Sequence, residues 1–196
     1  MQDRNPPADK ENIRTALIEA GLELIRDGGP EALSIRKVAA RVGVSHAAPA
    51  HHFPTLLHLR TAVATEAHRR FTQAMEAAIA EAPDTSRDAI VACCIGYLRF
   101  ARANPGLFHV MFGGQPLDPS DPAFCAASDA SYAVLARGCA PVAHGPAGAQ
   151  GTETLVWSLA HGFSALMLAG KQDLADQTAA EATFRAVFPD LSFTDS

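Results

Sequence analysis

Residues 34–53, SIRKVAARVGVSHAAPAHHF, limit the fold of this chain more than any other stretch. Apolar residues recur there at helical spacing, at Ile35, Val38, Ala39 and Val42. A helix capped by Ser34 is therefore predicted, and Gly43 can adopt the positive φ that ends it. Ser45 can cap a second helix that tolerates Pro49 in its opening turn. The pattern predicts helix, turn, helix, the unit that places its second helix in the DNA major groove.

The same stretch is basic, although the protein is acidic. The chain has 16 Lys and Arg against 21 Asp and Glu, a net charge of −5, yet residues 32–65 contain no Asp or Glu. Basic residues outnumber acidic ones up to residue 70, and acidic residues outnumber basic ones after it. This distribution indicates that the first part of the chain meets phosphate and the second part does not.

The predicted DNA-contacting residues lie on both helices of this unit. They are Ser34, Arg36, Lys37, Arg41, Ser45, His46, Ala47, Ala48 and His51. The cations and hydroxyls suit phosphate, the alanine methyl groups can contact thymine, and His46 can hydrogen-bond a base or a phosphate. The alternative for His46, Ala47 and Ala48 is that they are only good helix formers on a solvent-exposed face.

These residues resemble the DNA-binding domain of the TetR family of bacterial transcriptional regulators, over about residues 13–71. The chain keeps most of the family pattern, at Ser34, Ile35, Val38, Ala39, Gly43, Val44, Ser45, His52 and Phe53. It departs at Ala50, where the family usually has a tyrosine, and at Leu56, where it usually has a lysine. Both family residues touch the phosphate backbone, so the resemblance implies weak DNA affinity for the class.

The resemblance and the helical periodicity together predict an all-α fold of about nine helices. It comprises an N-terminal three-helix DNA-binding unit with the helix-turn-helix, a long connecting helix, and a C-terminal helical bundle for ligand binding and dimerisation. Helices are predicted over residues 10–27, 55–82, 86–103, 106–112, 123–139, 152–169 and 176–188, in addition to the two helices in 34–53. The predicted domains are a flexible tail at 1–9, a DNA-binding domain at 10–70 and a regulatory and dimerisation domain at 71–196. Residues 140–151 are predicted to be a flexible surface loop.

Composition and motifs argue against other classes of protein. The chain has no run of about 18 apolar residues, so no membrane span is expected, and its first residues lack the apolar core of a signal peptide. We therefore expect a cytoplasmic protein. The four cysteines lack zinc-binding spacing and are expected to be buried thiols. Because no nucleophile elbow, phosphate loop or metal motif occurs, no enzyme activity, catalytic residue, metal or cofactor is expected.

The second half contains WSLAHGF at residues 157–163, which resembles the W-x-x-x-H-G signature of one C-terminal domain type of TetR-like regulators. Trp157 and His161 are four residues apart and share a helix face. Either this face packs internally, with His161 bonded to a polar neighbour, or it lines a cavity for an effector. The predicted pocket residues are Tyr97, Phe100, Phe108, Met111, Phe112, Trp157 and His161. They would suit an apolar or aromatic small molecule with one polar group, bound by Tyr97 or His161.

The sequence thus predicts a DNA-binding transcriptional regulator, most simply a repressor that a small apolar or aromatic effector releases from its operator. A homodimer through residues 152–188 is expected, because two recognition helices must be held together to read a palindromic double-stranded operator. The alternative is a helical protein-interaction or ligand-binding module in which DNA binding is weak or lost.

Overall fold

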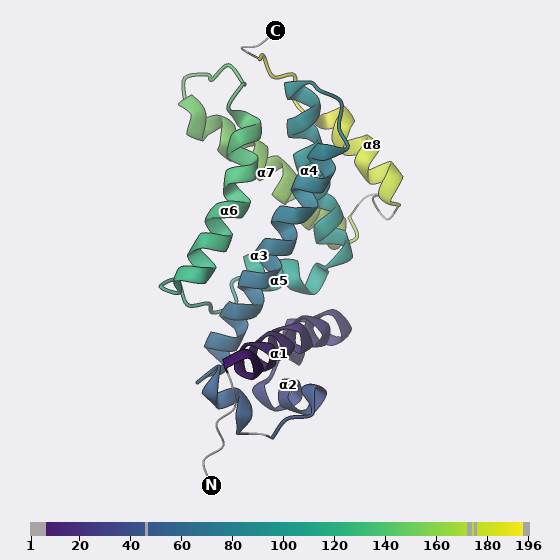
Figure 1. Cartoon of the computed structure of the whole chain (residues 1–196). Coiled ribbons are helices and arrows are strands. Elements are labelled where there is room, and N and C mark those ends of the chain that lie inside the picture. The colour runs from purple at the N-terminus through teal and green to yellow at the C-terminus, as the bar shows by residue number, and fades with distance from the viewer. Residues whose placement is uncertain (1–6, 46, 172–173, 175, 194–196) are drawn as a thin grey trace. The chain divides into compact units, whose positions relative to one another are not determined.

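The computed structural model describes residues 7–45, 47–171, 174 and 176–193, which form eight α-helices and two short 3-10 helices (Figure 1). They are α1 (Pro7–Gly28), η1 (Pro30–Ala32), α2 (Ile35–Val42), η2 (Ala48–His51), α3 (Leu56–Ala80), α4 (Ser86–Ala103), α5 (Pro105–Phe112), α6 (Pro122–Cys139), α7 (Gly148–Leu168) and α8 (Gln177–Val187). Within these residues the β structure is limited to an isolated antiparallel bridge between Val142 and Phe193. The predicted all-α fold is confirmed, with eight α-helices where about nine were expected.

The chain divides into two compact units. Unit 1 contains Met1–His68 and Pro105–Ala127, and unit 2 contains Arg69–Asn104 and Ser128–Ser196. The long helix α3 contributes to both units, as the chain passes from the first to the second at residue 69. α5 belongs with the first unit, although it follows α4 of the second unit after a single residue, Asn104.

α1 is the centre of the first unit, and α2, η1 and α5 pack against it. Two glycines allow close approaches to neighbouring elements. A Cβ on Gly21 would lie 2.8 Å from Val63 Cγ2 of α3, and a Cβ on Gly106 of α5 would lie 2.8 Å from the carbonyl oxygen of Ile25. α5 therefore packs against the backbone of α1 at a distance that only glycine permits.

α2 begins and ends where the sequence predicts. Ser34 has an extended backbone, and its hydroxyl accepts a hydrogen bond from the Lys37 N–H at 3.2 Å. Gly43 ends the helix in the left-handed region with φ 77°, and its N–H donates to the Ala39 carbonyl at 3.0 Å. The Val44 N–H donates to the same carbonyl, so the helix end has its hydrogen bonds satisfied before the turn.

The second helix of the predicted helix-turn-helix differs from the expectation. η2 is a four-residue 3-10 helix whose N-cap is Ala47, without a side-chain cap, so the predicted α-helix with a Ser45 cap is wrong. Pro49 lacks an N–H, would clash with a carbonyl four residues earlier in an α-helix, and disfavours the α conformation at Ala48. Pro49 is buried, and Pro54 follows directly after the segment. The prediction that an α-helix tolerates Pro49 is therefore also wrong.

α4 is the centre of the second unit, and both α7 and α8 pack against it (Figure 1). Three arginines of α4 fix α8 and the residues that flank it. The bonds are from Arg102 Nη2 to the Leu174 carbonyl (2.6 Å), from Arg99 Nε and Nη2 to the Glu181 carboxylate (2.8 and 3.0 Å), and from Arg87 Nη1 to the Pro189 carbonyl (3.2 Å). The hydrogen bond from Arg99 lowers the pKa of Glu181. The end of the chain is thereby bound to α4 before, within and after α8.

The predicted loop at residues 140–151 is more ordered than expected. Val142 is buried and forms the bridge with Phe193, and the Ala143 N–H donates to the Ser192 carbonyl at 2.8 Å. α7 already begins at Gly148. Because the partners of this segment lie some 50 residues later in the chain, its low-complexity composition gave no sign of them.

None of the described helices combines the length and the apolar character that crossing a bilayer requires.

Three of the four cysteines, Cys93, Cys94 and Cys139, are buried, and burial raises their pKa values, that of Cys139 to about 11. Their thiols are therefore protonated at neutral pH, which favours the interpretation as packing residues.

Candidate functional site

The exposed surface of α2 carries the first candidate site. Arg36 and Lys37 are exposed, and neither has an ion-pair or hydrogen-bond partner for its side chain among the described residues. The buried side of the same helix, at Val38 and Ala39, holds it on the first unit. The short helix α2, which Ser34 caps, thus exposes two cations that have no partner among the described residues.

Arg41, at the end of α2, differs from these two cations. Its Nη1 lies 2.9 Å from Asp27 Oδ2 and 3.4 Å from Glu23 Oε2, both on α1. The guanidinium is thereby partly neutralised and ties α2 to α1. Its predicted contact with phosphate stays a prediction, and such a contact would compete with these two carboxylates.

The segment that follows the turn exposes Ser45, Ala47 and His51, whereas Ala48 is half-buried. His46 lies outside the described residues, so its predicted contact stays a prediction. Phe53 anchors the segment: it is 2% exposed, and the Arg14 guanidinium lies 5.4 Å from its ring centroid.

The two positions at which the chain departs from the TetR pattern lie on either side of this anchor. Ala50 is exposed and Leu56, the first residue of α3, is half-buried. Both are therefore positions at which a longer side chain can reach solvent. Leu59 and Val63, the next residues of the apolar stripe of α3, are fully buried. The alternative to a position facing DNA is that the half-buried Leu56 only extends this stripe.

The way in which the loop after α5 is held on the first unit was not predicted from the sequence. The Asp118 N–H donates to Thr61 Oγ1 at 2.9 Å, and Arg60 Nη1 donates to the Pro116 carbonyl at 3.2 Å. Arg60, one of the cations of the acid-free stretch, is thus bound within the protein. Gly106, the second residue of the apolar helix α5, was the one sequence sign that α5 approaches another backbone.

In the second unit, the structure brings Tyr97 and His161 together. The Tyr97 hydroxyl lies 2.8 Å from His161 Nδ1. Burial raises the pKa of Tyr97 and lowers the pKa of His161, so both groups are neutral at pH 7. Phe71 packs against Tyr97 and Phe100, with ring centroids 4.6 and 5.2 Å apart. His161 therefore has a polar neighbour inside an aromatic cluster.

Ser164 is a second polar residue of α7, and its hydroxyl is buried without a hydrogen-bond partner among the described residues. It lies three residues after His161, and its side chain is fully buried. Trp157, by contrast, is 40% exposed and packs edge-on against Tyr132, with ring centroids 5.8 Å apart. Trp157 is thus more exposed than His161, although a hydrogen bond from its side chain also acts on the Tyr97 hydroxyl and lowers the pKa of Tyr97, against the larger effect of burial.

The other predicted pocket residues, Phe108, Met111 and Phe112, lie on α5 in the first unit. Phe108 and Phe112 pack together with ring centroids 5.0 Å apart, and His68 contacts Phe112 edge-on at 5.9 Å. Burial lowers the pKa of His68 to about 4, so it is a neutral part of this apolar cluster.

Among the described residues no group of three His, Cys, Asp or Glu side chains could hold a metal ion.

Comparisons with known proteins agree with this architecture. A transcriptional repressor of the helix-turn-helix type from Mycobacterium tuberculosis is 34% identical over 80 residues, which are 41% of each chain. The match thus spans about two fifths of that curated relative. A solved structure of a protein of unknown function from Rhodococcus sp. RHA1 has a TM-score of 0.75 and 26% identity and covers 97% of this chain and 100% of its own.

The structure of the multidrug binding protein EbrR, complexed with imidazole, is similar in fold, with a TM-score of 0.62 and 18% identity over 97% of this chain and 95% of that one. Residues 17–63 match the family described as bacterial regulatory proteins, tetR family. Residues 90–191, more than half of the chain, match the family described as Tetracyclin repressor-like, C-terminal domain. The chain therefore belongs to the TetR family of bacterial regulatory proteins.

Proposed function

We propose that the protein is a DNA-binding transcriptional repressor that a small uncharged aromatic or apolar effector releases from a palindromic operator. The observation that carries the proposal is the Ser34-capped α2, which presents Arg36 and Lys37 and ends at Gly43 in the turn expected of a helix-turn-helix. Proteins of this family regulate transcription and are not enzymes, and the curated relative is itself a repressor. Residues 10–70 form the proposed DNA-binding domain and 71–196 the regulatory domain.

Phosphate contacts from α2 are the part of this proposal that salt dependence can test. Each cation that binds DNA phosphate steepens the slope of log affinity against log salt by about 0.9. Both protomers of the proposed dimer carry each substitution, so Lys37→Gln is expected to make the slope shallower by about 1.8, about 0.9 for each protomer, whereas Leu56→Lys makes it steeper by a similar amount. Fluorescence anisotropy with DNA from the protein's own upstream region, at several salt concentrations, measures both slopes.

Lys171→Gln is the matched control, because Lys171 is also exposed but lies in the second unit. Its slope should equal that of the wild type. Ala50→Tyr should raise affinity with little change in slope, since the added hydroxyl is neutral. Wild-type slopes for both Lys37→Gln and Leu56→Lys would show that neither position faces phosphate, and the proposed docking of α2 on DNA would be wrong.

We further propose a C2 homodimer through residues 152–188. The described part of this segment exposes large apolar side chains, at Leu155 (50%), Leu166 (47%) and Val187 (52%). Leu155 and Leu166 are eleven residues apart on α7, which is close to three helical turns, so they share one stripe with Leu159 and Gly162. α8 adds exposed small residues at Ala179, Ala182 and Ala186. A face of this kind suits a second copy of the chain.

For the effector we propose a site around the hydrogen-bonded Tyr97 and His161, in a domain of the W-x-x-x-H-G type marked by Trp157, His161 and Gly162. The surrounding Phe71 and Phe100 rings favour an aromatic ligand, and the neutral pair favours an uncharged one. The predicted contributions of Phe108, Met111 and Phe112 stay part of the proposal. α5 follows α4 after one residue and packs on α1, so a shift of α4 can reach the DNA-binding domain.

Tyr97→Phe tests the effector site, because it removes the hydroxyl and keeps the ring. Thermal-shift screening of uncharged aromatic compounds should give at least one that raises the melting temperature and releases DNA from the wild type. The variant should respond to that compound about 10-fold more weakly, while its DNA affinity without the compound is unchanged. If no compound does both, the protein is not regulated by an effector of this class. An unchanged response of Tyr97→Phe would place the site elsewhere.

A further inference from the structure

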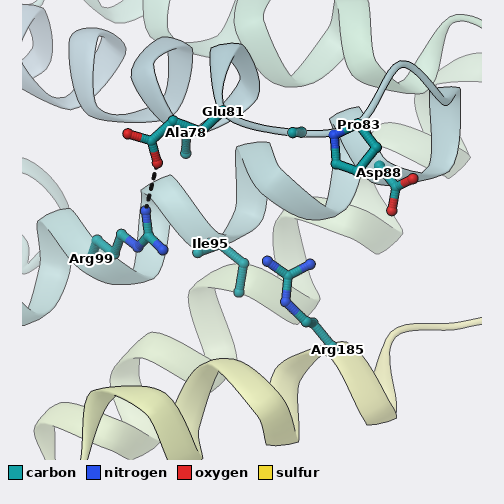
Figure 2. Close-up of a pocket in the computed structure, with 8 residues that line it drawn as sticks. Ala78, Glu81, Pro83, Asp88, Ile95, Arg99 and Arg185 are labelled. Carbon is teal, nitrogen blue, oxygen red and sulfur yellow. Dashed lines mark ion pairs between the residues drawn. The ribbon is translucent and has the colours of Figure 1, made fainter.

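A small pocket opens in the second unit where the end of α3 with the turn after it, α4 from Asp88 to Arg99, and the last turn of α8 come together (Figure 2). Its volume is about 140 Å³, and it lies apart from the cluster around Tyr97 and His161, with which it shares no lining residue. The residues that line it are Ala78, Glu81, Ala82, Pro83, Asp88, Ile95, Arg99 and Arg185. Four of these residues are therefore apolar and four carry charge.

Three of the four charged groups already have hydrogen-bond or ion-pair partners. Arg99 Nη1 lies 3.5 Å from Glu81, and its other nitrogens hold the Glu181 carboxylate in two hydrogen bonds. The Asp88 carboxylate accepts a hydrogen bond from the Thr85 hydroxyl at 2.5 Å. The two acidic groups of the pocket are thus engaged, and a cation entering it would have to displace these bonds.

Arg185 is the exception. In Figure 2 its guanidinium extends from α8 toward Ile95. Among the residues that the structure describes, none lies within hydrogen-bond or ion-pair distance of this group. Its charge contributes to lowering the pKa of Glu181, four residues earlier, but that carboxylate is bound by Arg99 and Gln177. Five N–H donors of a planar cation are therefore available at the pocket.

We propose that this pocket binds a small monocarboxylic acid with an aromatic ring or a short apolar chain, whose carboxylate pairs with Arg185. A guanidinium matches a carboxylate with two parallel hydrogen bonds, which a neutral ligand cannot form. The apolar part of the ligand contacts Ala78, Pro83 and Ile95. The volume fits a single ring, because a cavity of about 150 Å³ holds benzene.

Such a ligand would fasten α8 to the corner between α3 and α4, so its binding should raise the melting temperature of the protein. The proposal concerns a second ligand site and does not rest on DNA binding or on the effector site around Tyr97. Its test uses no DNA and can fail while the repressor proposal holds, or succeed while that proposal fails.

The test is isothermal titration calorimetry of the full chain with sodium benzoate at constant ionic strength, with benzamide as the neutral ligand of equal size. Benzoate should bind, and benzamide should bind at least about 10-fold more weakly. Arg185→Gln should weaken benzoate binding at least about 10-fold and leave benzamide binding unchanged, whereas Arg185→Lys, which keeps the charge but not the two parallel hydrogen bonds, should bind benzoate with an affinity between those of Arg185→Gln and the wild type.

Two further variants separate the pocket from general effects of charge. Arg137→Gln removes an exposed arginine of α6 outside the pocket and should bind benzoate like the wild type. Ala82→Phe places a ring at a half-buried lining position in the turn after α3 and should abolish binding while leaving the helical circular dichroism intact. Absent benzoate binding, equal binding of benzamide, or full binding by Arg185→Gln or Ala82→Phe would each overturn the proposal.

Discussion

Gly96→Ala is expected to lower the free energy of unfolding by about 3 kcal/mol and the melting temperature by roughly 6–12 °C. Gly96 lies in α4 where this helix crosses α3, and a Cβ there would be 2.6 Å from the Ala74 carbonyl oxygen and 2.6 Å from Met75 Cα. Both atoms belong to the backbone of α3, so no side-chain rotation can relieve the overlap. Urea unfolding followed by circular dichroism measures the change.

Gly138→Ala is the matched control, because it makes the same chemical change in a helix of the same unit. A Cβ at Gly138 would lie 3.6 Å from Ile90, an ordinary contact. Alanine favours the helix over glycine, so this variant should be more stable than the wild type by about 0.5 kcal/mol. Equal stability of the two variants would mean that α3 and α4 are not packed as closely as the structure shows.

Leu166→Glu is expected to convert the proposed dimer into a monomer and to weaken operator binding about 100-fold. Leu166 is half exposed on α7, and a carboxylate there would be repeated by symmetry across a C2 interface, where two like charges would be desolvated together. Two DNA-binding units that are no longer joined lose the advantage of binding both half-sites at once. Sedimentation equilibrium at micromolar concentration and anisotropy with operator DNA measure the two effects.

Ala130→Glu adds the same carboxylate at an exposed position of α6, outside the proposed interface, and should leave both properties unchanged. A wild-type chain that sediments as a single protomer would contradict the dimer. A Leu166→Glu variant that remains dimeric would place the interface on another face of the protein.

Helix ends with local capping signals were the most predictable part of the fold. Ser34, Thr85 and Asp176 each cap the helix that was predicted to begin beside them, at α2, α4 and α8. A cap depends on a side chain and an N–H two or three residues later, so a short window of sequence contains the whole interaction. The apolar stripe of α3 was equally local, since its spacing alone predicts a buried face.

Features that depend on partners distant in the chain were not predictable in the same way. Nothing near Val142 indicated that it would pair with Phe193, and nothing near α4 indicated that its arginines would bind carbonyl groups around α8. Pro49 is a local signal that was interpreted wrongly. The prediction placed it in the opening turn of an α-helix capped by Ser45, whereas the 3-10 helix η2 has Ala47 as its N-cap. The hydrogen bond between Tyr97 and His161 joins residues 64 apart, and the two were predicted as pocket residues without being paired with each other.

The three arginines of α4 make the last part of the chain intolerant of changes in length. Leu174, Glu181 and Pro189 are bound from fixed points on one rigid helix. One residue inserted into α8 would shift the residues beyond the insertion by about 1.5 Å along the helix axis and rotate them by about 100° around it. The hydrogen bonds to α4 could then be kept either by the residues before the insertion or by those after it, but not by both. Related chains can therefore be expected to vary in length between α7 and Leu174 or after Pro189, while the number of residues from Leu174 to Pro189 is constrained by α4.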